Sequence, residues 1–388
     1  MKKIFFLLGS MNVGGVEKAF LNLVSELPKD KYEIHLGLLK PRGGFMEDTP
    51  SHVTIHHINS YEKCWDVINN PPLKTIKGLF NSKQYIPALV HLFLYIINRT
   101  TRNYYLLYKY LLRKEPFFET KFDIAIAFAG PSQMIDYYIC EKVDAKVKYG
   151  WIHFDVTKFG IDRGMTNKLY RKYNKIFVVS ENAKEKFDLL FPKLRHKTQV
   201  FYNVVSRKLI LEQSNNGVSF SDSFDGYKIL TVGRISPEKG QDIAINALKI
   251  ILDKGYNVKW YFVGDGKLKA DCIQESKQLG ISDNVVFLGT KINPYPYMKD
   301  CNVYVQTSRH EGFCITLAEA LCFNNPIVST DFISATELLS NRTNSFVTTT
   351  DANDLANGVI KALSLSDSTQ ESTDSISKFN SDINLLFD

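Results

Sequence analysis

Short apolar runs alternate with amphipathic segments along the whole chain, and several of these runs are almost continuously apolar. Such runs are typical of parallel strands that helices cover on both faces. In the first half the expected strands are residues 3–9, 32–40, 53–59, 122–130, 147–154, 175–180 and 198–205. In the second half they are residues 227–235, 258–266, 284–290, 302–308, 326–330 and 344–349. Helix-like segments such as 16–28 and 183–191 separate them, which predicts an α/β fold with doubly wound parallel sheets.

A polar segment, EQSNNGVSFSDSFDG at residues 212–226, interrupts the alternation and has the composition of a linker. The 388 residues of the chain suffice for two domains of ordinary size. We therefore expect two Rossmann-like domains, at residues 1–215 and 216–375. Domains of this class bind ligands at the carboxyl ends of their strands, so the pattern predicts a central cleft between the two.

Charge is distributed unevenly between these halves. Residues 1–215 carry 33 Lys+Arg and 20 Asp+Glu, whereas residues 216–388 carry 15 and 21. The basic first half favours an anionic partner, such as a membrane surface or a phosphorylated acceptor, although a solvated surface rich in lysine is the alternative. Nucleic acid is disfavoured because the sequence has no basic recognition helix and no RNA-binding motif. The six cysteines include no C-x-x-C pair, which indicates reduced and mostly buried thiols.

Residues 85–112 depart from the surrounding pattern because they combine Tyr, Leu and Ile with interspersed basic residues. This composition suits a helix in a membrane interface, and the alternative is a helical insertion packed on its own domain. No apolar run has the length that a membrane-spanning helix needs. The opening MKKIFFLLGS leads into NVGG and predicts a first strand rather than a secretory signal. We expect a cytoplasmic protein, peripheral at the inner face of the cell membrane.

The first chemical motif is GSMNVGGVEKAF, at residues 9–20 between the first expected strand and a helix. Gly14 and Gly15 allow the backbone to approach a ligand closely, and a helix start favours an anionic or hydroxyl-rich group. A tight strand–helix turn without a ligand is the alternative.

The second motif is VGRISPEKG, at residues 232–240. We expect a strand to end at Gly233 and a short loop to present Arg234 and Lys239. Two cations at the carboxyl end of a strand suit a pyrophosphate group, since arginine can bind two of its oxygens at once. Two exposed surface cations without a ligand are the alternative.

The third motif is EGFCITLAE, at residues 311–319. Its two glutamates suggest a catalytic acid–base pair such as glycoside hydrolases use. Their expected setting indicates something else, because Glu311 would lie on a loop and Glu319 on the second turn of the helix that follows. A helix start offers free N–H groups to a phosphate, so the two carboxylates would contact opposite ends of one elongated anionic ligand.

Together these motifs resemble those of the retaining GT-B glycosyltransferases in the large bacterial group 1 family. The Glu-x7-Glu signature is matched by Glu311 and Glu319, and the basic loop is matched by Arg234 and Lys239. A glycine-rich first loop and the G-D-G pattern in FVGDG, residues 262–266, are also present. The similarity extends over essentially the whole chain.

The resemblance implies a role for each matched residue. Arg234 and Lys239 would bind the donor diphosphate, Glu311 the donor sugar and Glu319 the ribose. His153, in WIHFD, corresponds to a histidine that lies near the sugar in such enzymes. Further implied substrate contacts are Gly14, Gly15, Gly233, Gly264, Gly312, Phe313, Cys314, Ile315 and Thr316.

The implied reaction moves a sugar, with retention, from a UDP- or GDP-sugar to a glycan acceptor, expected to be lipid-linked, in bacterial capsule, O-antigen or similar polysaccharide biosynthesis. The resemblance implies no cofactor and no metal, and the sequence contains no Asp-x-Asp. A sugar-nucleotide epimerase or phosphorylase and a non-enzymatic partner of another transferase remain alternatives. The family usually ends in a helix that crosses back to the first domain, and residues 376–388 would form a short version of it.

Overall fold

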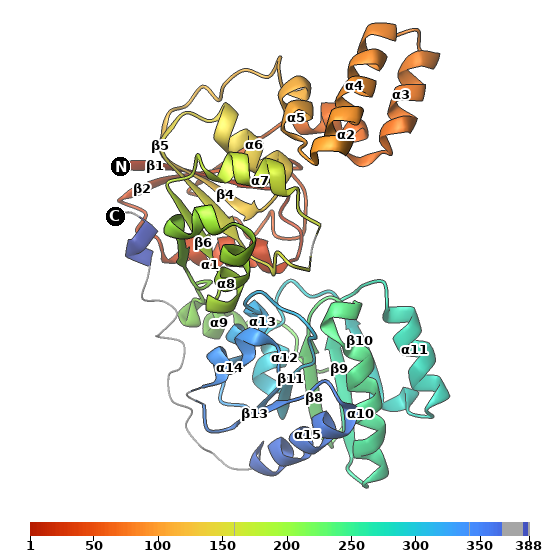
Figure 1. Cartoon of the computed structure of the whole chain (residues 1–388). Helices are drawn as coiled ribbons and strands as arrows, with labels where there is room; N and C mark the ends of the chain where they lie inside the picture. The colour runs from red at the N-terminus through yellow and green to blue at the C-terminus, as the bar shows by residue number, and fades with distance from the viewer. Residues whose placement is uncertain (159, 341, 367–382, 387–388) are drawn as a thin grey trace. The chain divides into compact units, whose positions relative to one another are not determined.

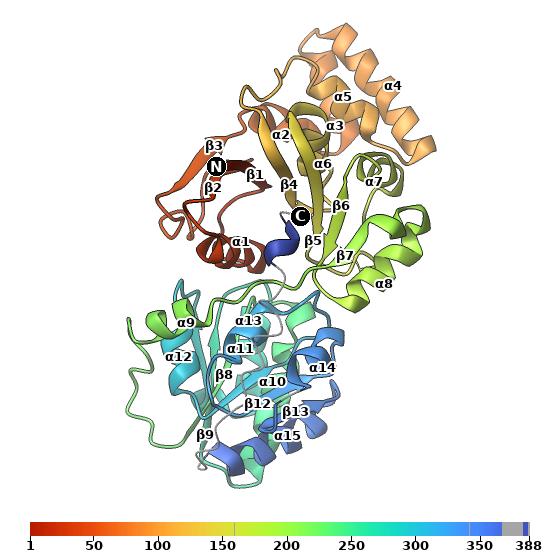
Figure 2. The ribbon, with the colours of Figure 1, turned by 90° about the vertical axis from the view of Figure 1, so that its left-hand side faces the viewer.

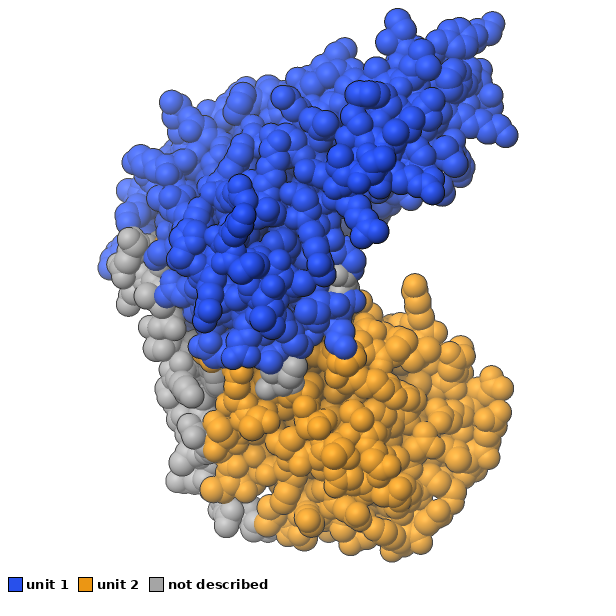
Figure 3. Space-filling model, viewed as in Figure 1, with its two compact units in different colours: residues 1–201 blue, residues 202–388 orange. Residues whose placement is uncertain are grey.

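The computed structural model describes the 388 residues except for 159, 341, 367–382 and 387–388 (Figure 1). The chain forms two compact units, Met1–Phe201 and Tyr202–Asp388 (Figure 3). The sequence placed the boundary near residue 215, within the second unit. Residues before that point belong to the second unit because α9 (Arg207–Ser214) packs against α12 (Tyr295–Asp300).

The described strands of the first unit form one parallel sheet of seven strands in the order β3-β2-β1-β4-β5-β6-β7 (Figure 2). Each expected strand of the first half is present. Their bounds are β1 (Lys2–Leu8), β2 (Tyr32–Leu38), β3 (Val53–His57), β4 (Phe122–Gly130), β5 (Ala145–Ile152), β6 (Lys175–Val178) and β7 (Thr198–Val200).

Two groups of helices accompany this sheet. One group packs on the strands, as α6 does against β1, β4 and β5. It comprises α1 (Gly15–Glu26), α6 (Gln133–Lys142), α7 (Arg163–Tyr170), α8 (Glu181–Leu190) and a 3-10 turn (Pro192–Lys197). The other group is an insertion between β3 and β4, from which α3 and α4 project as a hairpin (Figures 1 and 2). It comprises α2 (Ser60–Asn69), α3 (Pro72–Asn81), α4 (Tyr85–Thr101) and α5 (Tyr105–Leu111).

The described strands of the second unit form a parallel sheet of six strands in the order β10-β9-β8-β11-β12-β13. Each expected strand of the second half is present here too. Their bounds are β8 (Tyr227–Val232), β9 (Val258–Val263), β10 (Val285–Gly289), β11 (Val303–Gln306), β12 (Ile327–Thr330) and β13 (Ser345–Thr348).

Helices cover this second sheet, and α10 and α15 also pack against each other. Besides α9 and α12, the helices are α10 (Gln241–Asp253), α11 (Lys269–Gln278), α13 (Ile315–Ala320), α14 (Ile333–Leu339) and α15 (Ala352–Ser366). Short 3-10 turns lie at Pro237–Lys239, Ser282–Asn284 and Ile383–Leu386. Most of the expected C-terminal helix, at residues 376–382 and 387–388, lies outside the described residues.

The apolar character of the strands explains these folds. In β4, with the sequence FDIAIAFAG, side chains of both faces are buried, as a sheet covered by helices on both sides requires. The second unit has its own core, in which fully buried Trp260 of β9 packs with residues of β8, β11 and α10. The predicted fold class, two Rossmann-like α/β domains, is confirmed. Among the described helices, none combines the length and apolar character needed to cross a membrane.

Candidate active site

The predicted basic loop and the predicted glutamate loop follow neighbouring strands of the second sheet. β8 pairs with β11, and the strand order runs from β8 to β10 on one side and from β11 to β13 on the other. The point where the direction reverses is where ligands of doubly wound folds bind, at the carboxyl ends of the strands. Residues 233–240 and 307–314 meet at this point.

Lys239 and Glu311 form an ion pair across these two loops. The distance from Lys239 Nζ to Glu311 Oε1 is 2.5 Å, and the two side chains are only 20% and 11% exposed. Burial alone would lower the pKa of Lys239, but the attraction of Glu311 outweighs it and raises that pKa above its usual value. The lysine is therefore held charged at neutral pH, in a position to meet an anionic ligand.

A series of hydrogen-bonded, buried polar side chains holds Glu311 from the interior of the second unit. Ser308 Oγ donates to Glu311 Oε1 at 2.6 Å, and Gln306 Nε2 donates to Ser308 Oγ at 2.8 Å. Tyr304 OH in turn donates to Gln306 Oε1 at 2.9 Å. These three residues are almost inaccessible to solvent, so the carboxylate is held from the interior of the unit. The sequence analysis missed them, although consecutive polar residues at the end of a buried strand are a usable signal.

Arg309 connects the two loops, and it too was missed. Its guanidinium donates to both carboxylate oxygens of Asp242, at 2.9 and 2.5 Å, and to the Pro237 carbonyl at 2.8 Å. A bidentate arginine–carboxylate contact fixes geometry as well as contributing energy. Thr307 Oγ1 also donates to the Lys239 carbonyl at 2.8 Å. The backbone that carries Lys239 is thus fixed relative to the one that carries Glu311.

Arg234 contrasts with Lys239, its predicted partner on the basic loop. Its side chain is exposed and makes no ion pair with the residues that the structure describes. It lies close enough to Lys239 for its charge to lower the pKa of that lysine. The structure therefore brings the two cations together, one held by Glu311 and the other open to a ligand.

Gly264 lies in contact with Gly233, which explains the glycine at position 264. Gly264 has φ +143°, and a Cβ at that position would lie 1.9 Å from the Gly233 carbonyl oxygen. The loop after β9 therefore packs directly on the basic loop after β8. The predicted substrate contact of Gly264 has a structural explanation in this packing.

The side chains of the EGFCITLAE segment differ in how far they are buried. Phe313, Cys314 and Ile315 are buried, so only their backbones can contact a ligand. Gly312 is half-buried, and half-buried Thr316 donates to Gln306 Oε1 at 3.2 Å.

The helix α13 begins at Ile315, after Cys314 in the left-handed conformation with φ +63°. A non-glycine residue adopts that conformation at a cost of about 1–2 kcal/mol. Loop and helix therefore follow each other as the sequence predicted.

Glu319 does not join the cluster around Glu311. It is 2% exposed, and its Oε1 accepts a hydrogen bond of 2.7 Å from Tyr295 OH of α12. The structure thus unites Glu311 with Lys239 and places Glu319 in a separate buried setting. A shared proton between the two glutamates has no support in these contacts.

In the first unit, the glycine loop and His153 also follow strands. Gly14 is the N-cap residue of α1 and has an extended backbone, and Gly15 is the first residue of that helix. His153 follows β5, and its ring packs 4.7 Å from Phe128 and stacks on Trp151 at 5.9 Å. Burial lowers the pKa of His153 to about 3, so its imidazole is neutral at physiological pH. The sequence located these residues at strand ends, as the structure does.

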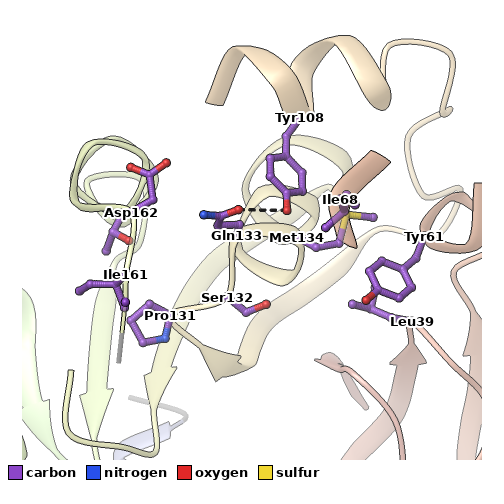
Figure 4. A pocket seen from close by; sticks show the side chains of 12 residues that line it. Leu39, Tyr61, Ile68, Tyr108, Pro131, Ser132, Gln133, Met134, Ile161 and Asp162 are labelled. Carbon is purple, nitrogen blue, oxygen red and sulfur yellow. Dashed lines mark hydrogen bonds between the residues drawn. The ribbon is translucent and has the colours of Figure 1, made fainter. Parts of the chain in front are cut away.

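A pocket of about 230 Å³ opens at the carboxyl edge of the first sheet (Figure 4). Tyr61 and Ile68 of α2, Tyr108 of α5 and Gln133 of α6 line it, and Tyr108 OH donates to Gln133 Oε1 at 3.1 Å. The other lining residues are Leu39, Pro131, Ser132, Met134, Gly160, Ile161, Asp162 and Thr166. Aromatic, apolar and hydrogen-bonding groups converge here, as in small-molecule sites. No motif pointed to this pocket, because its lining comes from separate segments.

Within the described part of the chain, no group of three or more His, Cys, Asp or Glu side chains could hold a metal ion.

Residues 221–378 match the family model described as Glycosyl transferases group 1. The second unit is therefore similar to the domain that this family model describes. The chain is 25% identical, over 85% of its length and 81% of the relative's, to N-acetylgalactosamine-N,N'-diacetylbacillosaminyl-diphospho-undecaprenol 4-alpha-N-acetylgalactosaminyltransferase of Campylobacter jejuni. It is 32% identical to the capsular polysaccharide biosynthesis glycosyltransferase CapM of Staphylococcus aureus, over 32% of this chain and 33% of CapM. Several other curated relatives are likewise matched over less than half of their own length.

Solved glycosyltransferases share the fold of the whole chain. The Anabaena HepE structure with UDP and glucose has a TM-score of 0.63 and 19% identity, covering 100% of this chain and 96% of HepE. This similarity confirms the GT-B fold. The family model and the named relatives are glycosyltransferases, the class that the sequence predicted, and the pathway, donor, acceptor and stereochemistry of this chain are left to be proposed.

Proposed function

We propose that this protein transfers a hexose-type sugar, with retention, from a UDP- or GDP-sugar to a glycan acceptor of a bacterial surface polysaccharide. The observation that carries the proposal is the Lys239–Glu311 ion pair at the switch point of the second sheet, with Arg234 beside it. A diphosphate needs cations that stay charged as it leaves, and a sugar needs a fixed hydrogen-bond acceptor. The paired lysine and carboxylate supply both within one small region.

We assign Arg234 and Lys239 to the donor diphosphate and Glu311 to hydroxyl groups of the donor sugar. As the C1–O bond breaks, negative charge accumulates on the leaving nucleoside diphosphate, and these cations stabilise it. The acceptor oxygen bonds to C1 on the same face, and its proton passes to the leaving phosphate. In this scheme the cations carry the charge, and no metal or other cofactor is required.

The remaining predicted contacts differ in how well the geometry supports them. Backbone groups of Gly233 and Gly312 lie in the two loops that meet at the switch point, so we retain them as donor contacts. Glu319 is buried and accepts a hydrogen bond from Tyr295, so its proposed ribose contact requires the ribose to reach a carboxylate that is inaccessible in this structure. His153, Gly14 and Gly15 remain proposed contacts from the first unit.

We assign the acceptor to the first unit and its sugar to the pocket around Tyr61 and Tyr108. Tyrosine rings and the Gln133 amide are suited to the apolar faces and hydroxyl groups of a sugar. The Campylobacter relative acts, by its name, on a glycan linked to diphospho-undecaprenol, which supports a lipid-linked acceptor. A lipid-linked acceptor would place the protein at the cytoplasmic face of the membrane.

Purified protein incubated with UDP- and GDP-sugars, with and without a lipid-diphosphate-linked glycan, tests the proposal. We expect release of nucleoside diphosphate only when acceptor is present, and formation of an α-linkage from an α-configured donor. Chelation of divalent metal with EDTA should leave the rate unchanged. Conversion of a sugar nucleotide to another without acceptor would identify an epimerase instead. Thermal shift with UDP and GDP reports the base, since a ligand that binds only the folded state raises its stability.

A further inference from the structure

The hairpin of α3 and α4 carries an apolar surface that no described residue of the first unit covers. Ile86, Leu89, Phe93 and Ile96 of α4 are 78%, 56%, 63% and 54% exposed. Their spacing of three and four residues places them on one face of the helix. We call these four residues the apolar stripe.

Neighbouring residues extend the surface around the stripe. Tyr85 is 57% exposed at the start of α4, and its ring centroid lies 6.3 Å from that of Phe80 on α3. Leu73, one heptad before Phe80 and on the same face of α3, is 59% exposed. Isolated exposed apolar residues are common on proteins, but a contiguous group of this kind marks an interaction surface.

The charge of the same segment indicates which partner this surface fits. Residues 71–114 contain no Asp or Glu, and their basic side chains are all exposed. These are Lys74, Lys77, Lys83, Arg99, Arg102, Lys109, Arg113 and Lys114. A second copy of this chain would bring two such segments together, and their like charges would repel. A partner with an apolar interior and an anionic surface satisfies both features.

We propose that the α3–α4 hairpin docks on an anionic lipid bilayer. The apolar stripe enters the boundary between headgroups and acyl chains, and the basic residues meet the lipid phosphates, as in interfacial amphipathic helices. The proposal rests on the proposed function only in that a lipid-linked acceptor resides in a membrane. It names the surface by which this chain would reach that acceptor.

The position of the hairpin within the first unit is consistent with such a role. Tyr61 and Ile68 of α2 and Tyr108 of α5 line the pocket, and α2 and α5 belong to the same insertion as α3 and α4. One insertion therefore carries both the wall of the proposed acceptor pocket and the apolar stripe. Docking through the stripe would bring the pocket to the membrane surface.

Flotation of the full-length protein with lipid vesicles, without any sugar substrate, tests the proposal. We expect binding to phosphatidylcholine vesicles that contain phosphatidylglycerol, weaker binding to phosphatidylcholine alone, and loss of binding as salt is raised. The variant with Leu89→Ser and Phe93→Ser should bind on the order of tenfold or more weakly, because it loses two buried apolar side chains. Leu189→Ser, at a residue of α8 that is 82% exposed, is the matched control and should bind normally.

The contribution of charge is tested in the same assay. Lys74→Gln with Lys77→Gln should weaken binding to the anionic vesicles, since each basic residue near the surface contributes about 1 kcal/mol, or roughly fivefold. Lys267→Gln with Lys277→Gln, at exposed lysines of the second unit, removes the same charge elsewhere and should have no comparable effect.

Equal vesicle binding by the stripe variant and the wild type would overturn the proposal. So would a concentration-dependent dimer that the stripe variant loses, because the surface would then bind a second copy. Transfer to a short soluble acceptor separates this proposal from the proposed function. If the protein binds vesicles but transfers no sugar, the proposed function is contradicted and the proposed docking surface is not. If it transfers sugar but does not bind vesicles, the docking surface is contradicted and the function is not.

Discussion

At the scale of single residues, the two side chains that contact Glu311 have different roles. Lys239 approaches its carboxylate from the loop after β8, and Ser308 approaches from the interior. The lysine is partly exposed and can contact a ligand, whereas Ser308 is inaccessible and can only hold the carboxylate in place. Ser308 is therefore a positioning residue.

Ser308→Ala tests this positioning role. Loss of the hydroxyl frees Glu311 from its inner contact and leaves Gln306 Nε2 without its acceptor, so we expect kcat to fall on the order of tenfold, a rise of about 1.4 kcal/mol in the activation free energy. The donor KM should change little, because Lys239 and Arg234 remain. Ser340→Ala removes an exposed hydroxyl that bonds only its own helix end, and serves as the control in steady-state kinetics. An unchanged kcat would show that Glu311 needs no inner support.

Alanine variants of Arg234 and Lys239 should differ in stability, although we assign both residues to the donor. Each alanine variant is expected to lower transfer by about two orders of magnitude or more, since each removes charge stabilisation in the transition state. Arg234→Ala should leave the unfolding free energy unchanged because its side chain is exposed and unpaired among the described residues. Lys239→Ala leaves Glu311 without its cation and should lower that free energy by about 1–3 kcal/mol.

Transfer assays combined with urea denaturation measure both effects. Normal transfer by Arg234→Ala would contradict its assignment to the diphosphate, and equal stability of the two variants would show that the ion pair contributes nothing to the fold.

The sequence identified Arg234, Lys239 and Glu311 as candidate site residues because local motifs mark them as loop residues after strands. It did not predict the ion pair between Lys239 and Glu311, which are 72 positions apart. It assigned Glu319 by its place on a helix and did not predict the hydrogen bond from Tyr295, which comes from a different helix. Contacts between distant segments depend on packing, which local patterns do not contain.

At the scale of elements, the second unit relies on close contact between its strand-end loops. Gly264 and Gly266 pack against the basic loop, where a Cβ on Gly266 would lie 2.1 Å from the Ile235 carbonyl oxygen. The loop that holds Arg234 is therefore supported by the loop after β9. A side chain at either glycine would displace it.

Gly264→Ala and Gly255→Ala separate crowding from backbone strain. Gly264 has φ +143° and no room, whereas Gly255 has φ +86° with nothing within 4 Å of its Cβ position. We expect Gly255→Ala to cost about 1–2 kcal/mol from strain alone. Gly264→Ala should cost several kcal/mol, because overpacking adds to the strain. Chemical denaturation of both variants measures the difference, and equal losses would show that the contact with Gly233 relaxes at no cost.

The insertion between β3 and β4 shows what pattern analysis can achieve at this scale. The sequence marked residues 85–112 as unusual and left open whether they pack on their own domain or face a membrane. The structure shows that Ala88 and Asn98 of α4 are buried while the apolar stripe is exposed, so the segment packs in part on its own domain, and contact with a membrane stays a prediction. The direction in which a helix turns its faces is set by its neighbour, here α3, and periodicity alone does not give it.

At the scale of the whole molecule, the two Rossmann-like folds were predictable because each parallel strand is a short apolar run. The unit boundary at residues 201 and 202 was not predictable, since it depends on α9 packing against α12. The first unit also contains two titratable residues, buried Asp136 and half-buried His153, whose pKa values move in opposite directions. Burial raises the pKa of Asp136, between Tyr173 and the Ser132 N–H group, to about 7, and lowers that of His153 to about 3.

These two groups should cancel in the pH dependence of the first unit's stability. Between about pH 4 and 6.5 the unfolded chain protonates His153 and the folded one does not, so this residue makes stability rise with pH. Over the same range the folded chain protonates Asp136 and the unfolded one does not, so this residue makes stability fall as pH rises. Each slope is at most about 1.4 kcal/mol per pH unit, and because the signs are opposite, the summed contribution of these two groups should change little over this range.

Single substitutions should expose each slope. Relative to the wild type, His153→Phe should lose stability as pH rises from about 4 to 6.5, and Asp136→Asn should gain it. Hydrogen exchange of β4 and β5 peptides reports the stability of the first unit, and comparison with the wild type at each pH removes the intrinsic pH dependence of exchange. Either substitution shifts the level of stability, so the slope is the test. Parallel profiles for both variants and the wild type would mean that neither group changes its protonation on folding in this range.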